Sequence, residues 1–300
     1  MTGVLRVTLT LLRRKGRILL TMRLYTNQDA GNILWEYAFE FLGIYTPEDN
    51  EYAKHGDVYF ISADDPELKI ESVLAGYATR DSELKMPQTV TWSVEGLGDL
   101  DTNLTQDSDT GVFRNKLTMP RVSGASGVVV AKLNGTNTEA KFDEVVVLPG
   151  KPADVVVNFT GTASVQGIGD MVANVRVIDA HGNDVLDGTS LSFSIEGDAY
   201  LGEYKGRTTQ GRVSTPVKGG LYSGTQNSLI VEVGSLRRVF PFEVNPLNVE
   251  FVTAPASSLV NQLQTVSLRV TDHQGQPVDD AFVDVSATHG RLSHNAIKTD

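Results

Sequence analysis

Short segments of this sequence recur at a spacing of roughly one domain length. The segment TWSVEG at positions 91–96 returns as SFSIEG at 192–197, 101 positions later, and RVID at 176–179 returns as RVTD at 269–272, 93 positions later. The copied segments are rich in the β-branched and aromatic residues that strands favour. A period of about 95 residues with such content predicts tandem β-domains, each folding as one unit.

This period divides the chain into four segments. We expect an N-terminal module at 1–56, then repeats at 57–152, 153–246 and 247–300, of which the last is incomplete because it stops soon after its expected fourth strand. The predicted fold class is all-β. The N-terminal module is expected to be β-rich, with an α+β arrangement as the alternative.

The second repeat shows its strands most clearly, because apolar residues recur at every other position. These inward positions are Val155, Val157, Phe159, Val175, Val177, Leu191, Phe193, Ile195, Leu229, Val231, Val233, Phe240, Phe242 and Val244. Short half-buried strands separated by turn signals indicate a β-sandwich. Pro241 is expected to point outward from an edge strand, since proline cannot donate a ladder hydrogen bond.

A turn motif joins the second and third strands of two repeats. It reads DAHGNDV at 179–185 and DHQGQPVDDAFV at 272–283. Asp can accept hydrogen bonds from the main chain two residues on, Gly accepts a positive φ, and Pro fixes φ before the chain enters the next strand.

With this motif, residues 57–300 resemble the bacterial immunoglobulin-like domains of the invasin and intimin group, whose repeats show D-x-x-G-x-P-V-x-x-A-x-V at this place. The third repeat fits well, the second has Asp184 in place of Pro, and the first lacks the Gly at 79–84. Similar turns occur in carboxypeptidase-regulatory-like sandwiches. The resemblance implies tandem immunoglobulin-like sandwiches that act as stalks at a cell surface.

The N-terminal module begins with a predicted β-hairpin. Alternating apolar residues run from Leu5 to Leu11 and from Ile18 to Leu24, on either side of a basic turn at 13–17. The hairpin fits two interpretations: the last two strands of an earlier repeat, or a separate capping module.

An aromatic segment follows the hairpin at 30–45. As a strand it would place alternate residues on one face; as a helix it would run from an Asp29 cap to a Gly43 stop. The segment is interpreted as core or as a docking surface for a partner subunit. The candidate interaction residues are Trp35, Tyr37, Phe39 and Phe41.

The composition and the absence of known motifs argue against several classes of function. The formal charge is −11, from 26 basic and 37 acidic residues, so nucleic acid is not an expected partner. There is no cysteine, which excludes disulfides and thiolate chemistry. No run of 18 apolar residues predicts a membrane-spanning helix. No nucleophile elbow, zinc-binding helix or phosphate-binding loop is found, so we expect neither enzyme activity nor a cofactor.

The most plausible ion site is an acidic loop of the first repeat. Its candidate calcium ligands are Asp99, Asp101, Asn103, Asp107 and Asp109. Oxygen ligands at such spacing can wrap Ca²⁺, but Leu104 stands where an EF-hand loop has Gly. A solvated acidic loop is the favoured interpretation.

Three functions remain open at this point. The first is a non-catalytic structural or adhesive protein at the cell surface or outside the cell, with a surface receptor or glycan as partner. The second is a bacteriophage virion or tail component, whose aromatic N-terminal module would contact neighbouring subunits. The third is an accessory region of a larger secreted enzyme.

Overall fold

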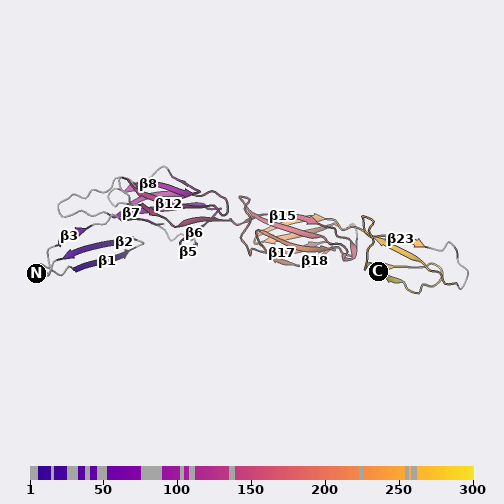
Figure 1. Cartoon of the computed structure of the whole chain (residues 1–300). Coiled ribbons are helices and arrows are strands. Elements are labelled where there is room, and N and C mark those ends of the chain that lie inside the picture. Colours follow the sequence, from indigo (N-terminus) through magenta and orange to yellow (C-terminus); the bar gives the residue numbers. More distant parts are fainter. Residues whose placement is uncertain are drawn as a thin grey trace. The chain divides into compact units, whose positions relative to one another are not determined.

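The computed structural model divides the chain into two compact units, Met1–Gly150 and Lys151–Asp300. It describes residues 6–14, 17–25, 33–37, 41–45, 53–75, 90–101, 105–107, 112–134, 139–222, 226–253, 257 and 262–300. Both units are built from strands, which can be followed along the chain in Figure 1. Within these residues the single helical segment is a 3₁₀ turn, η1 (Val165–Gly167). The predicted all-β class is confirmed.

The first unit contains fourteen of the described strands. In chain order they are β1 (Arg6–Arg14), β2 (Arg17–Tyr25), β3 (Ile33–Tyr37), β4 (Phe41–Tyr45), β5 (Ala53–His55), β6 (Val58–Ser62), β7 (Glu67–Ala75), β8 (Val90–Gly96), β9 (Asp99–Leu100), β10 (Thr105–Asp107), β11 (Val112–Thr118), β12 (Ser126–Leu133), β13 (Glu139–Lys141) and β14 (Glu144–Leu148).

Two sheets of this unit enclose a common core. One has the order β10-β11-β7-β4, with β9 also paired to β11; the other has the order β13-β12-β14-β6-β5, with β8 paired to β12. Alternate residues of both sheets point inward, among them the fully buried Leu68, Leu117, Val129 and Val145. The strands β6 and β14 run parallel over five residue pairs, whereas the other pairings of the unit are antiparallel.

The aromatic segment forms two strands that belong to different sheets. The strand β3 pairs with β2, which puts Trp35 opposite Leu24 and Tyr37 opposite Met22. The strand β4 pairs with β7, with Phe41 opposite Ala75. Over the described residues 33–37 and 41–45 the strand alternative is therefore confirmed over the helical one, in two strands that join different sheets.

The second unit begins with the second repeat. Its described strands are β15 (Pro152–Thr160), β16 (Val172–Asp179), β17 (Ser190–Glu196), β18 (Tyr200–Leu201), β19 (Lys205–Arg207), β20 (Arg212–Lys218), β21 (Asn227–Val233) and β22 (Leu236–Phe242), followed by β23 (Asn248–Thr253), β24 (Ser267–Thr271), β25 (Phe282–Asp284) and β26 (Ala296–Lys298).

The second repeat is a sandwich of two four-stranded sheets, ordered β15-β16-β20-β18 and β19-β17-β21-β22. Every inward position predicted from the alternation lies in its core or packs against it. Pro241 is exposed and lies on β22, an edge strand, as predicted. The immunoglobulin-like sandwich is confirmed here strand by strand.

The internal copies occupy equivalent places in the fold. The strand β8 pairs with β12, with Trp92 opposite Ala131, and the strand β17 pairs with β21, with Phe193 opposite Val231. In the third repeat, β24 and β25 correspond to β16 and β17 of the second. A small core of Val270, Val278 and Ala281 lies in this part of the chain. The predicted repeat boundaries within each unit stay a prediction.

Candidate functional site: the repeated Asp–Gly turn

The turn that carries the family resemblance is built around a buried carboxylate. Asp179 ends β16 and is only 2% exposed. Its Oδ1 accepts hydrogen bonds from the main-chain N–H of His181 at 2.8 Å and of Asn183 at 2.9 Å, and its Oδ2 accepts one from Asn183 Nδ2 at 2.8 Å. Gly182 takes a φ of 84°, which closes the turn without a steric penalty.

The third repeat forms the same turn 93 residues later. Asp272 Oδ1 accepts from the main-chain N–H of Gln274 and of Gln276, both at 2.8 Å, and Gly275 has a φ of 79°. In each turn the Asp N–H donates at 2.9 Å to the carbonyl four residues on, which belongs to Asn183 or Gln276. The turn predicted from the motif is confirmed in both repeats. The corresponding segment of the first repeat, 79–84, lies outside the described residues.

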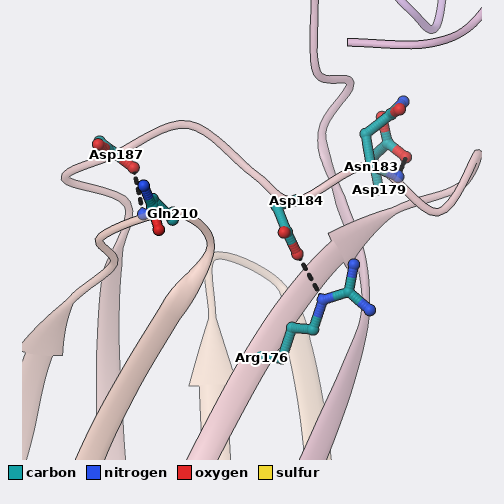
Figure 2. A network of polar contacts seen from close by, with 6 residues as sticks. All are labelled: Arg176, Asp179, Asn183, Asp184, Asp187 and Gln210. Carbon is teal, nitrogen blue, oxygen red and sulfur yellow. Dashed lines mark hydrogen bonds and ion pairs between the residues drawn. The ribbon is translucent and has the colours of Figure 1, made fainter.

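An ion pair stands beside the turn of the second repeat. Arg176 Nε on β16 donates to Asp184 Oδ1 at 2.5 Å, as Figure 2 shows. Asp184 occupies the position of Pro277 in the third repeat, and both residues bridge to the preceding strand, at Ile178 and Thr271. The turn therefore accepts Pro or Asp at this position.

A second carboxylate closes the neighbouring loop. Asp187 Oδ1 accepts from the main-chain N–H of Gln210 at 2.5 Å (Figure 2). Gln210 has a φ of 50°, and Thr209 and Arg212 bridge around it. These acidic side chains bind main-chain donors or an arginine of the same repeat, which is the chemistry of loop stabilisation.

Two exposed pairs shift a pKa. The main-chain N–H of Val155 and then the guanidinium of Arg238, at 2.9 Å from Asp154 Oδ1, lower the pKa of Asp154. The carboxylate of Glu95 raises the pKa of Lys141, whose Nζ lies 2.7 Å and 2.8 Å from its two oxygens.

The acidic loop proposed for calcium is only partly described. Asp99 lies opposite Thr118, and Asp107 lies opposite Val112, six positions away along β11. At about 3.3 Å per residue this separates the two backbones by roughly 20 Å, too far for one ion to bind both side chains. Asp99 and Asp101 are exposed, and Asn103 and Asp109 lie outside the described residues. No group of three or more His, Asp or Glu in the described part of the chain could hold a metal ion.

The candidate interaction residues are not brought together on one strand. Trp35 and Tyr37 belong to the sheet of β1, β2 and β3, and Phe41 belongs to the sheet of β7. Phe39 lies outside the described residues. A docking role for this segment stays a prediction.

No helix in the described ranges is long and apolar enough to cross a membrane.

One polar contact was not anticipated from the sequence. The side-chain amide of Gln166, in the loop after β15, pairs with the main chain of Phe282 at the start of β25. The only local signal was the composition SVQGIG at 164–169, which marks an irregular loop but names no partner.

Comparison with known proteins gives similarities in fold only. No protein-family profile matches the chain, and no curated protein matches it. Among solved structures, the D0–D1 domain of intimin is 13% identical, with a TM-score of 0.26 over 68% of this chain and 98% of that chain. InvD of Yersinia pseudotuberculosis is 15% identical, with a TM-score of 0.40 over 80% of this chain and 72% of that chain. The S-layer protein rSbsC is 13% identical, with a TM-score of 0.31 over 99% of this chain and 44% of that chain. The immunoglobulin-like assignment rests on the strand pairings described above.

Proposed function

We propose that this chain is a non-catalytic structural protein whose tandem immunoglobulin-like repeats act as a stalk or attachment module under tension. The observation that carries the proposal is the parallel pairing of early and late strands within a repeat. In the first repeat, β6 and β14 pair in parallel from Val58 opposite Glu144 to Ser62 opposite Leu148.

The second repeat has a shorter version of the same pairing. Ser164 and Asn245 form a parallel bridge, in which Val165 N–H donates to Asn245 O at 3.0 Å and Asn245 N–H donates to Ala163 O at 2.9 Å. When the two ends of a repeat are pulled apart, parallel neighbours slide along one another, so their hydrogen bonds are loaded together rather than one by one. This arrangement suits a domain that resists extension.

The turn motif supports a closer assignment. Its buried Asp and positive-φ Gly recur in two repeats, in the pattern of the invasin and intimin group. This resemblance supports the further proposal that the chain acts at the cell surface or outside the cell, with a surface receptor or glycan as the attached partner.

Single-molecule force spectroscopy of the full chain tests the mechanical role. We expect separate unfolding events for the repeats at 57–152 and 153–246, each releasing about 95 residues at roughly 3.5 Å per residue. Asn245→Pro removes one of the two main-chain donors of the parallel bridge and should lower the unfolding force of the second repeat. Asn245→Ala is the matched control, because it keeps the main-chain N–H.

Two results would contradict the proposal. One is extension of the native chain without distinct force peaks. The other is an equal unfolding force for the native protein and Asn245→Pro, with the fold of the variant verified by circular dichroism.

A further inference from the structure

The loop between β15 and β16 is held in place by its own repeat. Val165 N–H donates to Asn245 O, Gln166 N–H donates to Gly220 O at 2.7 Å, and Gly167 N–H donates to Gly219 O at 2.9 Å. Three consecutive main-chain N–H groups of the loop thus donate to carbonyl oxygens of Asn245 and of the segment 219–220 after β20. These main-chain hydrogen bonds hold the backbone of Gln166 independently of its side-chain contacts.

Gln166 occupies this position at a conformational cost. Its φ is 63°, in the left-handed region that residues with a side chain disfavour and that glycine adopts freely. The neighbouring loop residues Gly167 and Gly169 also have positive φ and are glycines. What the chain gains from a glutamine here must therefore come from the side chain.

That side chain makes two hydrogen bonds with one residue of the third repeat. Gln166 Nε2 donates to Phe282 O at 2.9 Å, and Phe282 N–H donates to Gln166 Oε1 at 2.8 Å. The amide reproduces the paired exchange that an antiparallel strand neighbour would make. The Phe282 side chain is 64% exposed. The loop therefore contacts the main chain of this residue through a pattern that any non-proline residue offers.

Apolar contacts accompany this pairing. Ile168, two residues after Gln166, and Leu247, in the segment joining the repeats, pack against the small core of Val270, Val278 and Ala281. The same loop thus presents a polar and an apolar contact to the third repeat.

We propose that the loop 161–169 is a docking site for the following repeat, and that Gln166 recognises the main chain at the start of that repeat's third strand. The partner it fits is an immunoglobulin-like repeat with a free N–H and C=O at this position, whatever its side chain. The inference rests on the proposed tandem role, since docking of successive repeats is what would stiffen a stalk.

Hydrogen exchange of the full chain tests the contact. In Gln166→Gly and Gln166→Met the Phe282 amide should exchange about fivefold faster, the change that corresponds to loss of a hydrogen bond of about 1 kcal/mol. Gln166→Gly also removes the left-handed strain, so the second repeat should be at least as stable as before, and protection of the Val231 amide that is not reduced verifies this. Phe282→Ala is the matched control and should leave exchange at residue 282 slow.

A distance measurement tests whether the contact orients the repeats. The chain has no cysteine, so spin labels can be placed at Ser194→Cys and Arg291→Cys without background. We expect the distance distribution to broaden in both Gln166 variants and to stay unchanged in Phe282→Ala.

The proposal is overturned if residue 282 exchanges equally fast in the native protein and both Gln166 variants, or if the distance distribution does not change. Failure of the docking site is distinguishable from failure of the mechanical role, because the force peaks of the individual sandwiches should persist in Gln166→Gly.

Discussion

Arg176 and Arg269 occupy the same position in successive repeats but pair with carboxylates from different parts of the fold. Arg176 pairs with Asp184 in the turn that follows its own strand, whereas Arg269 Nη1 pairs at 3.2 Å with Glu250 on the neighbouring strand β23. Two differences in sequence account for this. Pro277 takes the position of Asp184 and offers no carboxylate, and Val156 stands opposite Arg176 where Glu250 stands opposite Arg269. The turn itself is unchanged, because its geometry depends on the Asp and Gly rather than on the ion pair.

We therefore expect Asp184→Pro to leave the second repeat folded and to lower its free energy of unfolding by less than about 1 kcal/mol. Both partners are more than a third exposed, and such pairs contribute little. Urea unfolding of Asp184→Pro, Arg176→Met and the double variant gives the coupling energy, which should shrink further at high salt. A coupling well above 1 kcal/mol that persists in salt would contradict this interpretation.

The buried carboxylate of the turn should matter more. Asp179→Ala leaves the N–H groups of His181 and Asn183 without their acceptor and should destabilise the second repeat by about 1–3 kcal/mol. Asp179→Asn keeps the Oδ1 acceptor and should lose clearly less. Chemical denaturation monitored through the second repeat compares the two variants. Equal losses would mean that the charge, not the acceptor, stabilises the turn.

Substitutions at two glycines distinguish the cost of backbone strain from the cost of steric overlap. Gly182 has a positive φ but open space where a Cβ would lie, so Gly182→Ala should cost about 1–2 kcal/mol. Gly169 has a φ of 101°, and a Cβ there would overlap the carbonyl oxygen of Thr162, so Gly169→Ala should cost about 1–3 kcal/mol more. The difference in unfolding midpoint measures the overlap. Similar midpoints would show that the 161–169 loop adjusts freely, contrary to a preformed docking site.

The shifted pKa of Asp154 predicts a local pH dependence. Because its folded-state pKa is lowered, its stabilising contribution is present above the ordinary Asp pKa and is lost as pH falls through the folded value. Arg238→Met should move the Asp154 pKa part of the way back toward its ordinary value, since the Val155 N–H remains. NMR titration of the carboxyl carbon measures this. An unchanged titration would show that the guanidinium has no effect on the carboxyl group in solution.

Much of the fold could be predicted because the relevant interactions are local. The inward residues of the second repeat follow a two-residue period, and that period alone fixes which face of each strand is apolar. The Asp179 and Asp272 turns use hydrogen bonds between residues two and four positions apart, so a short motif contains all their partners.

The candidate sites were less predictable. The acidic spacing at 99–109 favours a solvated loop, with a calcium site as the alternative. In the structure Asp99 and Asp107 lie opposite residues of β11 that are six positions apart. The aromatic residues of 33–41 alternate as one strand would, yet β3 and β4 join different sheets. In both cases the spacing along the chain does not show which residues lie close together, because this depends on the strands with which these segments pair.

The sequence by itself determined the repeats, the β-class, the inward faces and the Asp–Gly turn, because each depends on neighbours within a few residues. Only the tertiary structure decided that β4 pairs with β7, that β6 and β14 run parallel, and that Gln166 meets Phe282, 116 positions along the chain. Main-chain hydrogen-bonding groups are nearly identical in every residue, so an alternating pattern marks a strand without naming its partner. The partner is chosen by the packing of a whole core.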